Sequence, residues 1–250
     1  MQEKHNFICI IEKKAVPLQS KDLRMEEKQY IGQLFDRIAS TYDGLNHGLS
    51  LNIDRLWRKK AVALMPAVGH VLDVAIGTAD LAIAMLRKGK AQRVTGIDLS
   101  DKMMEVGKVK CRDLDPQPQF VLGSAEQIPF PDASFDAVTI AFGLRNFDHR
   151  AECLQEIRRV LKPGGRLAVL EFAVPKNPLW RALYLFYFKH AMRLVGKAVG
   201  SGSAYGYLVD SVLAFPRYET LCREFEAAGF TRVRYDTYSG GIACGYSACK

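Results

Sequence analysis

A strand, a turn of small residues and a new helix follow one another over residues 71–80, and this passage constrains the fold more than any other in the chain. The apolar run 71–75 leads into Gly77, so a nucleotide-like ligand can approach bare backbone there. A second short apolar run, over residues 94–97, ends at the carboxylate of Asp98. An acid at that place can accept hydrogen bonds from both hydroxyls of a ribose. Together the two passages indicate a cofactor that contains adenosine.

The sequence around these passages alternates between strands and helices. The periodicity predicts strands over 71–75, 93–97, 119–122, 135–141 and 166–172, and helices over 80–88, 101–110 and 150–161. Such alternation is typical of an α/β fold, a parallel sheet with helices on both faces. A helix over 217–228 and strands over 231–238 and 242–248 predict an antiparallel end to the sheet.

The N-terminal quarter is predicted to be helical. Apolar residues recur at three-and-four spacing over 26–42, and a second helix is expected over 54–64. We expect these helices to form a cap over residues 25–65, preceded by a flexible extension at 1–24.

A second helical region interrupts the alternation late in the chain. Residues 179–195 are rich in large apolar side chains, but four basic residues interrupt them too often for a membrane-spanning helix. A helix that packs over the sheet or lines an apolar pocket fits better. We therefore expect an apolar helical insertion at 177–215 within one domain that covers 25–250.

Composition limits the partners and excludes some chemistry. The chain has 250 residues, is 48% hydrophobic and carries a formal net charge of +8, which favours anionic partners such as nucleic acid, a lipid surface or an acidic substrate. The six cysteines are scattered without metal-ligand spacing, so we expect no metal site and no disulfide framework. A reduced, cytoplasmic protein is the simplest interpretation.

The small-residue loop argues against a dinucleotide. Such a cofactor needs three glycines to bring backbone N–H groups against its pyrophosphate, whereas this chain has Gly77, Ala79 and Ala82 at those places. S-adenosylmethionine carries no phosphate, and Asp73 can lie near its cationic centre while Asp98 holds its ribose. If Ala79 adopts a positive φ, that conformation costs on the order of 1 kcal/mol. The alternative is a tight turn with no ligand.

Two further pairs of residues follow predicted strands. Ser124 and Ala125 come after the strand 119–122, where small side chains leave room for an adenine ring; an ordinary loop is the alternative. Arg145 and Asn146 follow the strand 135–141 and would project into the crevice beyond the carboxyl ends of the strands. Their alternative is an arginine paired with a nearby acid and an asparagine in a local turn.

The ordered set of motifs resembles the ubiquinone/menaquinone biosynthesis C-methyltransferase family, over about residues 33–250. The motifs begin with FDRIASTYDGLN at 35–46 and LSLNIDRLW at 49–57. FGLRN at 142–146, RVLKPGGR at 159–166, LEF at 170–172 and SAYGYL at 203–208 follow. The resemblance implies a Rossmann-like, class I S-adenosylmethionine-dependent methyltransferase with a seven-stranded, mostly parallel sheet.

The resemblance also implies roles for individual residues. Cofactor contacts are implied at Asp73, Gly77, Thr78, Asp98, Ser124 and Ala125. Arg145 and Asn146 are implied to face a quinol as the catalytic residues, where they would stabilise a developing phenolate and orient a water molecule. Tyr42 and Asp43 are further candidates, for closing over the cofactor, and His149 for proton transfer.

The implied reaction is transfer of a methyl group to a ring carbon of a reduced prenylated quinol. Demethylmenaquinol is the favoured substrate, and a benzoquinol precursor of ubiquinone is the alternative. An RNA or small-metabolite methyltransferase and a degenerate, non-catalytic cofactor-binding protein are the competing interpretations, although nothing resembles an RNA-binding module. Peripheral association with the inner face of the membrane and a homodimer are further expectations, and no nucleic-acid partner is expected.

Overall fold

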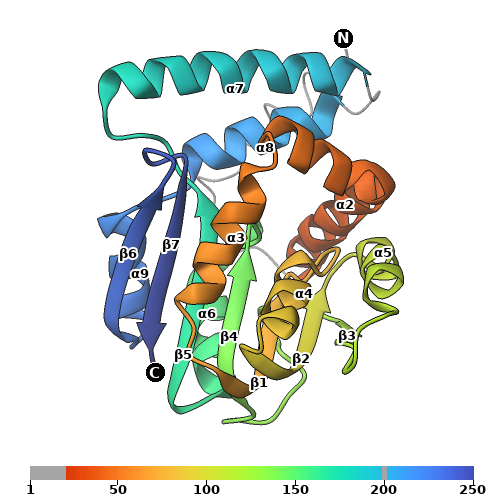
Figure 1. Ribbon diagram of the computed structural model, residues 1–250, viewed down its shortest axis with the longest axis vertical. Coiled ribbons are helices and arrows are strands. Elements are labelled where there is room, and N and C mark those ends of the chain that lie inside the picture. Colours follow the sequence, from red (N-terminus) through yellow and green to blue (C-terminus); the bar gives the residue numbers. More distant parts are fainter. Residues whose placement is uncertain (1–20, 199–201) are drawn as a thin grey trace.

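Seven strands form one sheet in the order β3-β2-β1-β4-β5-β7-β6 in the computed structural model, which describes residues 21–198 and 202–250 (Figure 1). The strands are β1 (Val68–Val74), β2 (Ala91–Asp98), β3 (Gln119–Leu122), β4 (Phe135–Ala141), β5 (Leu161–Phe172), β6 (Thr231–Tyr238) and β7 (Ala243–Cys249). The first five are parallel, and β7 pairs antiparallel with both β5 and β6. The predicted fold class is confirmed.

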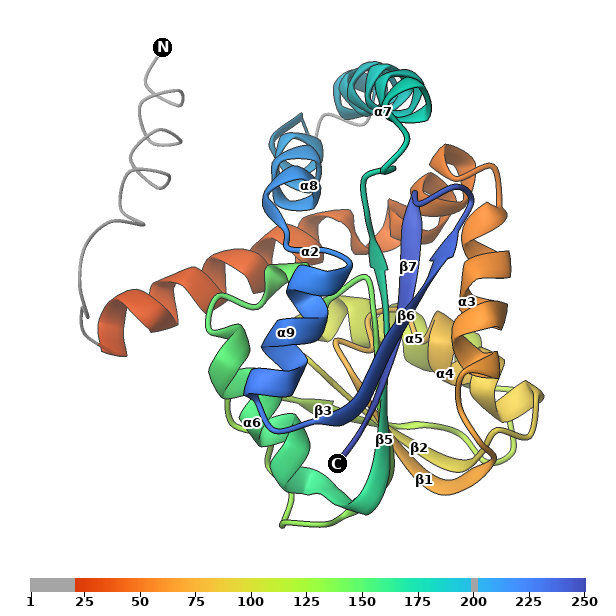
Figure 2. The ribbon, with the colours of Figure 1, turned by 90° about the vertical axis from the view of Figure 1, so that its left-hand side faces the viewer.

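Helices cover both faces of the sheet (Figure 2). One core cluster joins it to α3 (Ile53–Ala63), α4 (Asp80–Arg87) and α5 (Asp101–Cys111), and the other joins it to α6 (Arg150–Val160) and α9 (Glu219–Ala227). Central strands are therefore apolar on both sides, as in other parallel sheets. This packing accounts for the near-continuous apolar runs of β1 and β4.

The remaining helices lie over the carboxyl edge of the parallel strands (Figure 1). They are α2 (Lys21–Leu49), the short helix η2 (Leu144–Asn146), α7 (Pro178–Ala198) and α8 (Gly202–Ala214). Strand order reverses between β1 and β4, and ligands of open α/β sheets bind above such a point. The fold thus places four helical elements above the expected site.

Three of the differences from the predicted boundaries matter most. The helix predicted over 26–42 runs from Lys21 to Leu49, so the chain is already helical within the extension expected at 1–24; residues 1–20 lie outside the described part. The insertion contains two helices, α7 and α8, where one was predicted over 179–195. Strand β5 begins at Leu161, before the predicted 166–172, because Leu161 already pairs with Phe135 and the pairing then shifts across the Pro-Gly-Gly turn.

Candidate active site

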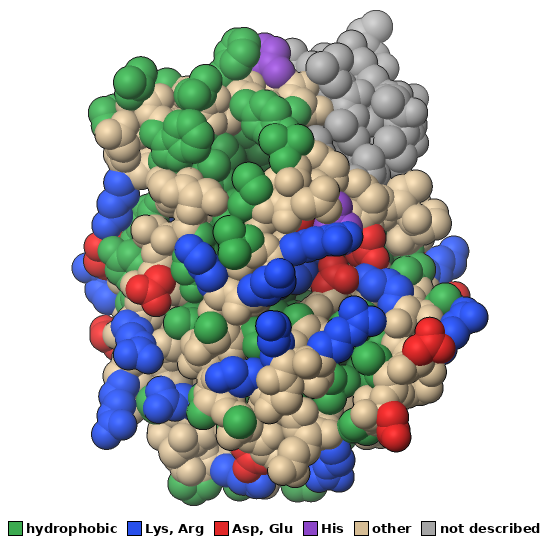
Figure 3. Space-filling view, in the orientation of Figure 1, with side chains coloured by type: hydrophobic (Ala, Val, Ile, Leu, Met, Phe, Trp, Pro, Cys, Tyr) green, Lys and Arg blue, Asp and Glu red, His purple; other side chains and the backbone are tan. Residues whose placement is uncertain are grey.

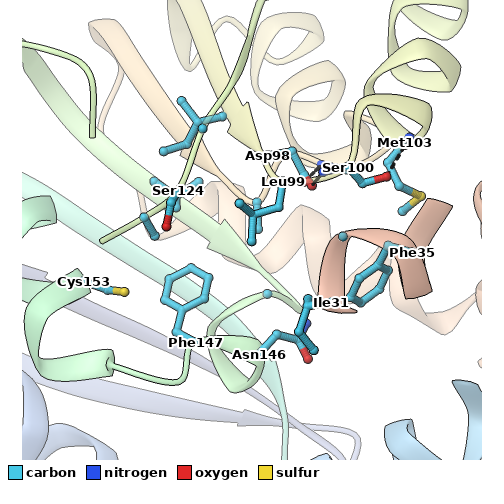
Figure 4. A pocket seen from close by; sticks show the side chains of 18 of the residues that line it. Ile31, Phe35, Asp98, Leu99, Ser100, Met103, Ser124, Asn146, Phe147 and Cys153 are labelled. Carbon is cyan, nitrogen blue, oxygen red and sulfur yellow. Dashed lines mark hydrogen bonds between the residues drawn. The ribbon is translucent and has the colours of Figure 1, made fainter. Parts of the chain in front are cut away.

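A cleft at the carboxyl ends of β1, β2 and β4 gathers most of the predicted site residues. It spans about 820 Å³ of space, open solvent included. Its walls come from α2, from the loops after β1, β2 and β3, and from η2 (Figure 4). Of the predicted residues, Gly77, Asp98, Ser124, Ala125 and Asn146 line it.

The loop after β1 holds an unusual backbone. Ala75, Gly77 and Ala79 have φ values of 57°, 54° and 66°, and Phe142 across the cleft has 57°. Ala79 therefore adopts a positive φ, and the expected conformational cost of about 1 kcal/mol applies to it. Left-handed non-glycine residues that cluster at one place are typical of functional sites, because the surrounding fold must impose them.

The carboxylate of Asp98 is fixed by two backbone donors. It accepts hydrogen bonds from the Gly77 N–H at 2.7 Å and from the Ser100 N–H at 2.9 Å. Burial raises the pKa of Asp98, and these backbone hydrogen bonds partly offset the increase. Each carboxylate oxygen has a second lone pair, so the group can still accept hydrogen bonds from ribose hydroxyls.

Asp73 lies below the cleft and does not line it. Its side chain is buried within the sheet, where it accepts a hydrogen bond from the Thr139 hydroxyl at 2.7 Å. Burial raises its pKa to about 7, and the Thr139 hydrogen bond acts in the opposite direction. Asp73 can therefore affect the cleft only indirectly, by supporting the end of strand β1.

Thr78 is also buried, and it faces α2. Its hydroxyl donates to Asp43 at 2.6 Å, and Lys110 of α5 contacts the same carboxylate at 2.5 Å. About two turns earlier in α2, Asp36 accepts a hydrogen bond from the Ser100 hydroxyl at 2.5 Å. These two links fasten α2 to the loops of the cleft.

An ion-pair network continues this fastening toward α3 and α4. His47, Asp54 and Asp80 bring one potential ligand atom each within 4.8 Å of one another. Cationic side chains already occupy the group: Arg58 lies 3.3 Å and Lys110 2.6 Å from Asp80. The cluster is best explained as an ion-pair network that joins four helices.

Two predicted catalytic residues, neighbours in the chain, have different surroundings. Arg145 is held in a buried ion pair with Glu171 at 3.0 Å and donates to the Phe142 carbonyl, so its guanidinium does not line the cleft. Asn146 does line the cleft, and its amide oxygen accepts a hydrogen bond from the Tyr207 hydroxyl of α8 at 3.2 Å.

Of the further candidates, Tyr42 lines the cleft and His149 does not. Tyr42 lines the cleft, and burial raises its pKa while the nearby Arg145 and Arg58 charges lower it. His149 stands at the start of α6 outside the cleft, with its Nε2 buried and without a hydrogen-bond partner. Glu126 follows Ala125 along the wall, and its backbone N–H donates to the Ser124 hydroxyl at 3.2 Å.

Sequence reasoning missed an apolar part of the lining. Ile31, Phe35, Leu99, Met103 and Phe147 surround the cleft together with Ser100 and Cys153 (Figure 4). Ile31 and Phe35 belong to the periodic pattern of the first predicted helix, and such a pattern does not distinguish residues facing a core from residues facing a ligand. The capping serine, Ser100, was the available signal, because it directly follows the strand that ends at Asp98.

The fold and the cleft define a class of protein. An S-adenosylmethionine-dependent methyltransferase from Thermotoga maritima shares the fold with a TM-score of 0.63 and 20% identity over 88% of this chain and 99% of its own. The cyclase SpnF shares it as well, with a TM-score of 0.58 and 19% identity over 89% and 96% of the two chains. The architecture is that of the Rossmann-like S-adenosylmethionine-dependent methyltransferases, although the fold alone does not fix a reaction.

Sequence comparison narrows the class to one family. The chain belongs to the ubiE/COQ5 methyltransferase family, whose model matches residues 23–250. Similar proteins include a ubiquinone/menaquinone biosynthesis C-methyltransferase UbiE from Syntrophotalea carbinolica, 42% identical over 87% of this chain and 92% of its own. A demethylmenaquinone methyltransferase from Deinococcus radiodurans is 42% identical over 88% and 92%, and one from Listeria welshimeri 39% identical over 90% and 97%. S-adenosyl-L-methionine is accordingly the cofactor.

Proposed function

We propose that this protein methylates a ring carbon of a reduced prenylated quinol and that demethylmenaquinol is its substrate in menaquinone biosynthesis. Membership of the family and the names of its similar relatives support the reaction class. The observation that carries the proposal is the cleft itself, in which the Asp98 loop and the amide of Asn146 line the same space. A cofactor and an aromatic ring can therefore meet there.

The residues present fit the cofactor. The Asp98 carboxylate would hold the ribose hydroxyls, and the small residues Ser124 and Ala125 would leave room for the adenine against Leu99 and Phe147. The backbone of the loop at Gly77 is open, since a Cβ there would meet only the Met103 methyl, at 3.6 Å. Asp73 and Thr78 would act indirectly, Asp73 through Thr139 and Thr78 by holding α2 closed through Asp43.

S-adenosylmethionine supplies an activated methyl group when bound, so the chain has to align a carbon nucleophile with it and exclude water. Asn146 would donate from its amide nitrogen to the phenolate oxygen that makes the ring carbon nucleophilic, and the Tyr207 hydroxyl, which donates to the amide oxygen, would orient the amide. The positive charge of Arg145 would act on the phenolate from a distance, without direct contact. The hydrogen bond from Arg145 to the Phe142 carbonyl would hold η2 in place. A positioned water molecule would accept the ring proton.

The domain arrangement follows from these roles. Residues 25–250 would form one methyltransferase domain, in which the cap at 25–65 closes the cofactor side. The insertion at 177–215 would cover the quinol side, and the inward-facing Tyr184 and Phe188, whose rings stack at 5.3 Å, would line the path of the prenyl tail.

A methyl-transfer assay with three acceptors tests the proposal. Purified protein with labelled S-adenosylmethionine should methylate reduced demethylmenaquinone with a short prenyl tail, and at least 10-fold more slowly a benzoquinol precursor of ubiquinone. Transfer RNA serves as the control and should accept no label. Faster transfer to the benzoquinol would reassign the substrate, and labelling of RNA alone would overturn the proposal.

A further inference from the structure

Helix α7 exposes a continuous apolar face on the outside of the molecule. Large side chains project into solvent at Leu179, Trp180, Leu183, Phe186 and Tyr187, with exposed fractions between 38% and 81%. Their spacing of one, three and four residues places them along one side of the helix. Inward-facing Tyr184 and Phe188 are 6% and 5% exposed, so the helix is apolar on both sides.

A second group of exposed apolar residues adjoins this face. Leu51, Ile53 and Leu56 occupy the start of α3 and the turn before it, and they are 74%, 39% and 51% exposed. Trp57 of α3 donates to the Ser239 hydroxyl at 2.8 Å, and Trp180 of α7 donates to the Ser239 carbonyl at 3.3 Å. Both tryptophans meet at one residue, so α3 and α7 both contact the turn between β6 and β7.

Basic side chains border these apolar residues. Exposed cations are Arg55, Lys59 and Lys60 on α3, and Arg181 and Lys189 on α7, whereas Lys176, just before α7, is paired with the exposed Glu219 at 2.8 Å. Figure 3 shows Lys and Arg side chains gathered below the apolar area at the top of the molecule. Over the described side chains of these two helices the one carboxylate, Asp54, is 3% exposed, so no acidic group on them faces outward.

We propose that this docking face, formed by the eight exposed apolar residues of α3 and α7, inserts into the interface of a bilayer that contains anionic lipids. An apolar helix face with a cationic border and no exposed acid on its own two helices is complementary to acyl chains below anionic headgroups. No helix in the described residues is long and apolar enough to span a membrane, so α7 would lie in the plane of the interface.

The benefit of docking for substrate delivery rests on the proposed function. Helices α7 and α8 cover the carboxyl edge of the sheet where the cleft lies (Figure 1). Docking through α7 would set the quinol side of the cleft against the bilayer, so a prenylated substrate could reach it without crossing water. A second copy of this chain is a weaker occupant, because a twofold contact through the same face would bring the two cationic borders together.

Vesicle flotation tests the docking face without substrate. Wild-type protein should float with vesicles of phosphatidylcholine and phosphatidylglycerol at low salt, and at least 10-fold less with phosphatidylcholine alone. The double variant Leu183→Gln/Phe186→Gln should lose at least 10-fold in partitioning. Its matched control is Val109→Gln/Leu122→Gln, which alters two residues that are 56% and 63% exposed on α5 and β3, and should float like the wild type.

A second pair of variants tests whether the cations beside the apolar face contribute to vesicle binding. Arg181→Gln/Lys189→Gln should weaken binding to anionic vesicles by about 10-fold or more at low salt, with the loss fading at high salt. Lys102→Gln/Lys108→Gln removes two exposed cations from α5 and should change binding much less. Equal losses in both pairs would reduce the effect to net charge and would overturn a specific face.

Four further results separate the outcomes. Circular dichroism and transfer to a short-tailed, soluble quinol should be unchanged in all four variants, which shows that they fold. Vesicle binding without any methyl transfer would contradict the proposed function and leave the docking face standing. The docking face is overturned if Leu183→Gln/Phe186→Gln leaves both methyl transfer and flotation unaffected. If this variant changes the oligomeric state in size-exclusion chromatography without changing flotation, the face belongs to an interface with a second copy of the chain.

Discussion

Charged and polar residues in this protein divide into those that face the cleft and those that hold it from behind. Asp98 and Asn146 are of the first kind, whereas Asp73, Thr78 and Arg145 are buried against Thr139, Asp43 and Glu171. Residues of the first kind are expected to change binding or turnover when they are replaced. Those of the second kind are expected to change stability first, because their replacement removes hydrogen bonds or ion pairs that hold the cleft together from behind.

Replacing Asn146 should affect turnover more than binding of the cofactor. Asn146→Ala removes the amide that would donate to a phenolate oxygen, and loss of one such donor costs about 100-fold to 1,000-fold in kcat. Tyr207→Phe should cost less, with kcat falling by less than 10-fold, since it only frees the amide oxygen. Steady-state kinetics with saturating cofactor measure both, and an unchanged kcat in Asn146→Ala would contradict the assignment.

The Arg145–Glu171 pair should show strong coupling. Arg145→Met leaves the Glu171 carboxylate buried and unpaired, which costs about 3–5 kcal/mol of unfolding free energy. Arg145→Met/Glu171→Gln should be less destabilised than the single variant. Urea unfolding of the four proteins of this cycle measures the coupling, and methyl transfer by the double variant tests whether the charge of Arg145 contributes to the reaction. Additive losses would contradict a buried pair.

Asp73 should make stability depend on pH. Its folded pKa, about 7, lies above its ordinary value, so the folded state holds the proton more tightly. The stability that this proton contributes is present below about pH 4 and is lost as pH rises toward about 7. Unfolding free energies measured across this window should therefore fall for the wild type relative to Asp73→Asn. The exposed Asp113→Asn serves as a control and should follow the wild type.

Elements meet closely where the loop after β1 rests on β2. A Cβ at Gly96 would lie 2.7 Å from the Ile76 Cβ, so only glycine lets the loop pack on the strand. Helix α2 completes the arrangement from the other side through Asp36 and Asp43. The shape of the cofactor site thus depends on contacts between elements that lie far apart in the chain.

Gly96→Ala should disturb that contact. We expect a loss of about 1–3 kcal/mol in unfolding free energy, because Ile76 cannot move without shifting the loop, and a weaker affinity for S-adenosylmethionine. Gly44→Ala is the matched control: it lies in α2 with nothing within 4 Å of an added Cβ, and it should be neutral or stabilising. Thermal unfolding and isothermal titration check both, and wild-type affinity in Gly96→Ala would contradict the role of this contact.

The described residues form one sheet with a cleft at its carboxyl edge, which α2 and η2 help to wall and over which α7 and α8 lie (Figure 1). Ligand binding to such a cleft stabilises the folded state by mass action. S-adenosylmethionine at about 100 times its dissociation constant should add about 2.7 kcal/mol, which corresponds to a rise of roughly 5–10 °C in Tm. NAD, which carries a pyrophosphate, should produce no comparable shift.

Asp98→Asn provides the control for that thermal shift. Replacing the carboxylate should raise the dissociation constant of S-adenosylmethionine by about 10-fold to 100-fold, so that the same concentration of cofactor raises Tm much less. An undiminished shift in this variant would place the ribose elsewhere.

Local patterns in the sequence were sufficient to predict the alternating elements, the mostly parallel sheet, and the positions of Gly77, Asp98 and Asn146 at strand ends. These features follow from periodicity and from the rule that parallel strands end at a common edge. The family was also recognisable, from the order of its motifs.

Only the tertiary structure decided which of the predicted residues line the cleft. Side-chain direction depends on partners far away in the chain, and Glu171, 26 residues after Arg145, draws that guanidinium out of the cleft. The same holds for Ile31 and Phe35, since an amphipathic helix buries its apolar face equally well against a core or a ligand site. A sequence specifies which groups are near a strand end, and packing between elements determines where those groups point.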